Sequence, residues 1–90
     1  MGLIKNDGFN VKGVQIAPAY AKINRVYLEN GNNAVAYFGI SNSRENLEEG
    51  NMLEEINFNC EIDKKQDKIF NEIYVKAKEE LFKDWQDDIR

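Results

Sequence analysis

The stretch MLEEINFNCEI, residues 52–62, decides the fold of this chain. Its apolar residues recur at every second position, so that Ile56, Phe58, Cys60 and Ile62 share one face while polar residues occupy the other. Such alternation predicts an antiparallel strand with one face on a hydrophobic core and one face in water. Cys60 lies on the core side of this pattern, which favours a buried structural thiol over a reactive one.

An amphipathic helix is predicted directly after this strand. Its apolar positions are 69, 70, 73, 74, 77, 81 and 82, a stripe with the period of 3.6 that suits packing on a sheet. Asp63 and Gln66 have the spacing of a capping box at its start. Three Asp residues at 84, 87 and 88 oppose the helix dipole, so we expect the helix to end near Trp85. Trp85 is in phase with the stripe and should pack under the last turn, whereas an exposed Trp85 would mark a docking spot.

Two more strands are predicted upstream, over residues 19–29 and 34–42. Asn30-Gly31 joins them, and this dipeptide between strand-like runs is a strong hairpin signal because both residues tolerate positive φ. The second strand has a clear apolar face, but neither face of residues 19–29 is cleanly apolar. Residues 43–50 predict one turn of helix, with Ser43 as its N-cap and Gly50 as its stop.

These elements predict an α+β fold. We expect a three-stranded antiparallel meander with a C-terminal amphipathic helix packed on one face. Residues 1–18 are interpreted as an extended N-terminal arm, because three glycines break any helix and Pro18 ends a short strand around Val11 to Ile16. Residues 19–90 then form a single domain.

The composition excludes much chemistry. The 90 residues include no histidine and one cysteine, which removes histidine triads, histidine-ligated metals, zinc clusters and internal disulfides. No phosphate-binding glycine motif is present. The sequence therefore predicts a protein that is not an enzyme and has no cofactor and no metal.

Charge and hydropathy limit the kinds of partner that the chain is expected to bind. The net charge of −4 is uneven, since residues 1–40 carry four basic and two acidic groups and residues 41–90 carry eight basic and fourteen acidic groups. An acidic chain lacks the basic footprint of nucleic-acid binding. No apolar run approaches the roughly 20 residues of a membrane span, and the first ten residues lack the apolar region of a signal peptide. We therefore expect neither a nucleic-acid partner nor a membrane.

The run from Ile16 to Ile23, IAPAYAKI, resembles the opening of small proteins encoded by phages and prophages of low-GC Gram-positive bacteria. Further similarity lies in the segment ISNSRE at 40–45, in IFNEIY at 69–74 and in the acidic WQDD at 85–88. The resemblance implies a gene of the tail or baseplate module and a location in the virion or the host cytoplasm. It implies no catalytic residues.

Three hypotheses about function remain. The first is a phage structural or assembly protein that binds other phage structural proteins or itself, as a homo-oligomer, through the arm and the open sheet face. Its candidate interaction residues are Val14, Ile16, Tyr20, Tyr27, Tyr37 and Trp85. The second is a small acidic inhibitor of a host nucleic-acid-binding protein, which requires one shared surface for Glu45, Glu48, Glu49, Glu54, Glu55, Asp84, Asp87 and Asp88. The third is an enzyme or small-ligand binder, which requires a pocket with a strongly shifted carboxylate or lysine.

Overall fold

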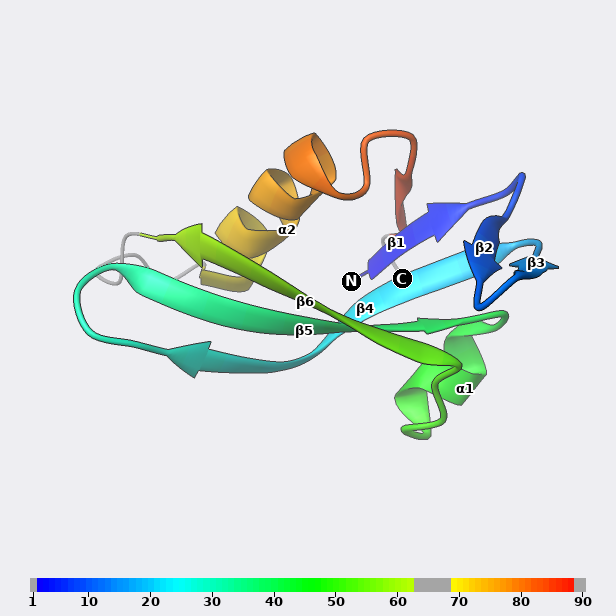
Figure 1. The fold of residues 1–90 in the computed structure, drawn as a ribbon, viewed down its shortest axis with the longest axis horizontal. Helices are drawn as coiled ribbons and strands as arrows, with labels where there is room; N and C mark the ends of the chain where they lie inside the picture. The colour runs from blue at the N-terminus through cyan, green and yellow to red at the C-terminus, as the bar shows by residue number, and fades with distance from the viewer. Residues whose placement is uncertain (1, 63–68, 89–90) are drawn as a thin grey trace.

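The computed structural model describes residues 2–62 and 69–88, which form a mostly β protein built on one antiparallel sheet of five strands (Figure 1). The strand order is β6-β5-β4-β1-β7, and β2 and β3 form a separate hairpin. The elements are β1 (Gly2–Lys5), β2 (Phe9–Val11), β3 (Val14–Ile16), β4 (Ala19–Leu28), β5 (Asn33–Ser41), α1 (Arg44–Glu48), β6 (Glu54–Glu61), α2 (Ile69–Glu80) and β7 (Gln86–Asp88). The predicted fold class, a three-stranded meander with one helix, is therefore wrong.

The predicted meander is the larger part of this sheet. β4, β5 and β6 pair antiparallel in sequence order, and the Asn30-Gly31 turn joins the first two, with Gly31 at a φ of 73°. Phe58 is buried on the helix-facing side of β6, whereas Asn57 and Asn59 on the other side are exposed. The alternation in residues 52–62 thus predicted the strand and its orientation correctly.

The extended N-terminal arm is the main error. β1 lies inside the sheet between β4 and β7, and Leu3 is a fully buried core residue. β2 and β3 follow as a hairpin whose turn residues, Lys12 and Gly13, both have positive φ, the requirement of a type I′ turn. Lysine is not a typical residue for this conformation, so the hairpin had no recognisable turn signal.

A β-bulge in β4 explains why neither face of residues 19–29 looks apolar. The register with β5 shifts between Ile23 and Arg25, so that Asn24 is an extra residue. Ile23 before the bulge and Val26 after it therefore face the same core, although they are three positions apart. Arg25 and Tyr27 move to the opposite face, which strict alternation cannot predict.

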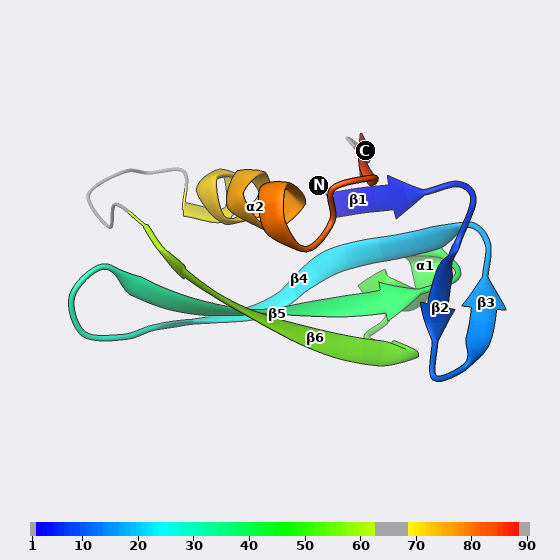
Figure 2. The same cartoon turned by 45° about the horizontal axis from the view of Figure 1, so that its top comes forward.

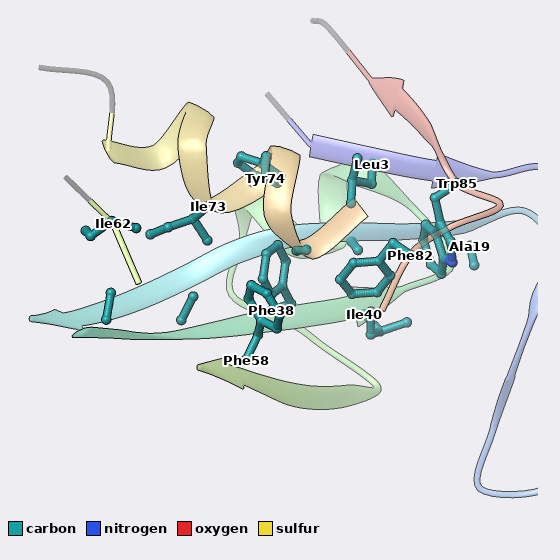
Figure 3. Packing of buried hydrophobic residues seen from close by; sticks show 14 of the residues in the cluster. Leu3, Ala19, Phe38, Ile40, Phe58, Ile62, Ile73, Tyr74, Phe82 and Trp85 are labelled. Carbon is teal, nitrogen blue, oxygen red and sulfur yellow. The ribbon is translucent and has the colours of Figure 1, made fainter. Parts of the chain in front are cut away.

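α2 covers one face of the sheet and encloses the core (Figures 2 and 3). Phe38, at the centre of β5, contacts Tyr74 and Phe82 edge-on, with ring centroids 5.6 and 5.1 Å apart. α2 ends at Glu80, five residues before the predicted end, because the N–H groups of Leu81 and Phe82 both bond to the carbonyl of Ala77 and close the helix. The predicted capping box, residues 63–66, lies outside the described residues.

The chain after α2 returns to the sheet. Trp85 is 4% exposed and packs 5.1 Å from the ring of Phe82, so the prediction that it lies in the core is confirmed. Gln86–Asp88 then pair with β1 as the edge strand β7. The three residues of β7 are polar, so no hydrophobic pattern predicts this strand.

α1 lies on the opposite side of the sheet from α2 (Figure 1). The Ser43 hydroxyl accepts a hydrogen bond from the N–H of Asn46 at 3.1 Å, so the predicted N-cap is confirmed. Leu47 packs on Gly39 of β5, where an added Cβ would lie 3.3 Å from the leucine methyl. α1 therefore covers one end of the second face and leaves the other end open.

Candidate interaction surface

The uncovered part of the second sheet face is the strongest candidate for a functional surface. We call it the open face and define it by Arg25 and Tyr27 of β4, Val35 and Tyr37 of β5, and Glu55, Asn57 and Asn59 of β6. Strand pairing places these side chains in rows, since Tyr27 lies opposite Val35 and Tyr37 lies between Arg25 and Asn57. The face combines aromatic, amide and charged groups on three strands that the sheet holds rigidly.

The centre of the open face is a fixed aromatic and cationic cluster. The rings of Tyr27 and Tyr37 are perpendicular, with centroids 5.7 Å apart. The Arg25 guanidinium carbon lies 4.4 Å from the centroid of the Tyr37 ring, a cation–π geometry. Tyr27 nevertheless remains 52% exposed, so a large aromatic surface is presented to solvent in a defined orientation.

Glu55, on the edge strand β6, orients this cluster. Its carboxylate accepts hydrogen bonds from Arg25 Nη2 at 3.0 Å and from the side-chain amide of Asn24 at 2.9 Å. Partial desolvation disfavours the charge of Arg25, but the charges and hydrogen bonds of Glu55 and Tyr27 together outweigh it, and the pKa of Arg25 is raised. The bulge residue Asn24 and the arginine are thus held by one acceptor, and the positive charge at the centre is neutralised.

The predicted interaction residues lie in four separate places. Tyr27 and Tyr37 come together on the open face. Tyr20 lies on the same side of the sheet but under α1, with the Arg44 guanidinium 5.7 Å from its ring. Trp85 is buried and unavailable to a partner.

The two residues predicted within the arm lie in the hairpin. Val14 is 62% exposed on β3, and Ile16 packs partly against the core. Neither residue contributes to the open face. Arg25 was missed as a site residue, although its spacing of two from Tyr27 was a usable signal.

The acidic residues that an inhibitor requires are spread over α1 and its C-cap, β6, β7 and the turn before β7. Glu54 and Glu55 lie on β6 and Asp87 and Asp88 on β7, and these two strands are the opposite edges of the sheet. Three of the carboxylates are also paired with basic groups, in the pairs Arg25–Glu55, Arg44–Asp88 and Lys78–Asp87. A basic groove on a host protein would therefore meet acidic residues that are divided among several elements and partly neutralised.

The one cysteine of the chain lacks the environment of a reactive thiol. Cys60 is half-buried, and burial raises the pKa of its thiol, which keeps it neutral and poorly nucleophilic. Across residues 2–62 and 69–88, no three His, Cys, Asp or Glu side chains gather as a metal site requires.

No family model, curated protein sequence or solved structure matches this chain. Neither helix in the described part of the chain is long and apolar enough to cross a membrane.

Proposed function

We propose that this protein is a non-enzymatic interaction module that binds another protein through the open face. The observation that carries the proposal is the Arg25–Tyr37–Tyr27 cluster, which is exposed and at the same time fixed by its own contacts. Tyrosine and arginine are enriched among residues that dominate binding energy at protein interfaces. A cluster that is ordered before binding loses little conformational entropy when a partner arrives.

The chemistry of the face favours a protein partner over a nucleic acid. Arg25 is paired with Glu55 at 3.0 Å, so the face offers phosphate groups no unpaired guanidinium. The surrounding Asn57 and Asn59 side chains are exposed donors and acceptors. Tyrosine with asparagine is the composition that antibody combining sites use against protein surfaces.

The sequence resemblance to phage and prophage proteins supports a more specific proposal. In this proposal the chain is a structural or assembly component of a tail or baseplate, and it acts in the virion or the host cytoplasm. Its partners are other phage structural proteins or further copies of itself. Self-association is tested by sedimentation, because a stable monomer at high micromolar concentration would count against the homo-oligomer.

A photo-crosslinking experiment tests the interaction surface. A benzophenone amino acid is placed at Tyr27 in the full chain, which is expressed together with its phage or prophage module. We expect crosslinks to another tail protein or to a second copy, identified by mass spectrometry. The matched control is Val75 on α2, which is 57% exposed on the other side of the molecule. Equal crosslinking at both positions would contradict the open face, and absence of the chain from purified particles and their assembly intermediates would contradict the tail assignment.

A further inference from the structure

Half of β4 has a free edge on the side of β1. β1 pairs with β4 only at Ala19, Tyr20 and Ala21, although β4 continues to Leu28. Among the described residues, no strand pairs with β4 beyond Ala21 on this side. An uncovered strand edge is a template for a further strand.

The backbone groups that this edge presents follow from the pairing of β4 with β5. Opposite residues in an antiparallel pair alternate between hydrogen-bonded and non-bonded pairs. The N–H of Glu29 donates to the carbonyl of Asn33 at 3.0 Å, so the pairs of Leu28 and Val26 with β5 belong to the non-bonded class. The N–H and C=O groups of Val26 and Leu28 therefore point away from β5, toward the free edge.

Ile23, on the other side of the bulge, also presents its N–H to this edge. Its N–H also points away from β5 and donates to the Tyr74 hydroxyl of α2 at 2.8 Å. At Ile23 the helix therefore occupies the place that a strand would take, and the open positions on the edge begin after it.

A groove runs between this edge and α2. Its helix wall includes Phe70 and Tyr74, and its strand wall includes Lys22, Ile23 and Arg25. Phe70 is 58% exposed, so its ring offers apolar surface along the groove. Leu28, further along the same edge, is 53% exposed.

The charge of the groove selects among extended segments. Among the described residues, its ionisable lining consists of Lys22, Arg25 and the tyrosine hydroxyl, with no carboxylate. Arg25 is already paired with Glu55, so Lys22 supplies the net positive charge of the groove. Complementary charge across an interface favours the matching partner and disfavours the wrong one. The groove therefore fits an extended segment that carries acidic side chains beside apolar ones.

We propose that an acidic, extended segment of a partner protein adds to the free edge of β4 as a further strand and places apolar side chains against Phe70. Backbone hydrogen bonds to Val26 and Leu28 supply affinity, and the groove supplies side-chain selection, as in other cases of strand addition beside a helix. This proposal does not depend on the proposed binding role of the open face, although Arg25 borders both surfaces.

A fluorescent eight-residue peptide that alternates valine with glutamate and threonine is the probe. We expect its anisotropy to rise on titration with the full chain, and the matched peptide with lysine in place of glutamate to bind about tenfold more weakly. Amide resonances of Val26 and Leu28 should shift on binding. Absence of binding at about 1 mM protein, or equal binding of both peptides, would overturn the proposal.

Two pairs of variants locate the site. Val26→Pro removes one outward N–H, whereas Val26→Ala shortens the same side chain and keeps that N–H, so we expect about tenfold weaker peptide binding for the proline variant relative to the alanine variant. Phe70→Ser should weaken binding and Val75→Ser, at a similarly exposed position on α2, should not. Circular dichroism establishes whether each variant is folded. If Val26→Pro is unfolded, the comparison of Phe70→Ser with Val75→Ser decides the test.

The competing occupant is a second copy of the chain. If the protein without peptide forms a dimer that both Val26→Pro and Phe70→Ser abolish, the edge belongs to self-association and the acidic segment is refuted. If peptide binding survives both variants, the peptide binds elsewhere and the proposal fails.

Discussion

The hydroxyl of Tyr74 on α2 accepts a hydrogen bond from the backbone N–H of Ile23 on β4, over 2.8 Å. Ile23 is the residue at which β4 has passed the last described partner in β1, so the helix takes over the pairing that the strand has lost. At the opposite edge of the sheet, the Lys76 ammonium donates to the backbone carbonyl of Glu61 on β6. α2 thus does more than cover the core, because it satisfies backbone groups at both edges of the β4–β5–β6 meander.

Removing the Tyr74 hydroxyl should destabilise the protein without opening a cavity. We expect Tyr74→Phe to lower the free energy of unfolding by about 1 kcal/mol at neutral pH, because the ring remains and the hydrogen bond to Ile23 is lost. Urea denaturation measures this difference. Faster amide exchange at Ile23 than in the wild-type chain would identify the lost bond as the cause, and an unchanged stability would contradict it.

The same residue makes stability sensitive to alkaline pH. Burial raises the pKa of Tyr74, although the hydrogen bond from Ile23 opposes part of this shift. Since the unfolded tyrosine ionises first, near pH 10, the stability contributed by neutral Tyr74 is complete below about pH 10 and is lost as the pH rises through the folded pKa. The stability difference between wild type and Tyr74→Phe should therefore narrow between urea titrations at about pH 9 and pH 11, and a constant difference would refute this.

The bulge at Asn24 inserts one residue into β4 that has no partner in β5. Deleting Asn24 would restore simple alternation without changing any face, because Asn24 is the extra residue in the pairing and Arg25 would still lie opposite Tyr37. We expect a loss of no more than about 2 kcal/mol, measured by urea denaturation, because no charged group is buried and only the local twist and the bond to Glu55 are lost. Asn24→Ala keeps the residue count and loses only the exposed bond to Glu55, so it should cost less than about 1 kcal/mol. A loss of more than about 3 kcal/mol on deletion would contradict this account, because it would mean that side chains of β4 had changed faces.

This bulge also shows where sequence reasoning succeeds and where it fails. Residues 52–62 alternate without interruption, and their strand, faces and pairing partner could be predicted. Residues 19–29 alternate in two phases, and the point at which the phase changes depends on pairing with β5 rather than on any local propensity. The inconsistent pattern was visible in the sequence, but its cause was not.

The strands that were missed are those held by tertiary contacts. β7 contains only Gln86, Asp87 and Asp88, and it forms because β1 offers an edge and the buried Trp85 anchors the preceding residue. On the open face, the two tyrosines could be predicted from strand periodicity. The contact between Arg25 and Glu55 could not, because it joins strands that are not neighbours in the sheet.

Two glycines with similar backbone conformations should respond differently to alanine. Gly8 has a φ of 93°, and an added Cβ would lie 2.4 Å from the carbonyl oxygen of Ile16, a backbone atom that cannot move alone. Gly13 has a φ of 86°, with no heavy atom within 4 Å of the added Cβ. We expect Gly13→Ala to cost about 1 kcal/mol, from its left-handed conformation alone, and Gly8→Ala to cost clearly more. Thermal unfolding of the two variants compares them, and equal costs would mean that Gly8 and Ile16 can move apart within the hairpin.

The contact between α1 and β7 should control how firmly the C-terminal strand is held. Arg44 donates to both carboxylate oxygens of Asp88, at 2.7 and 2.5 Å, and this hydrogen bonding raises the pKa of Arg44. Asp87 also pairs with a cation, Lys78 at 3.2 Å, but its side chain is 47% exposed whereas that of Asp88 is 14% exposed. Because a shielded bidentate pair is worth more than a solvated one, Asp88→Asn should accelerate amide exchange across β7 and the adjoining β1, and Asp87→Asn should leave it nearly unchanged. Amide exchange in β5 serves as the internal reference, because faster exchange there as well would indicate global destabilisation rather than release of β7. Equal effects of Asp88→Asn and Asp87→Asn would contradict a specific role for Asp88.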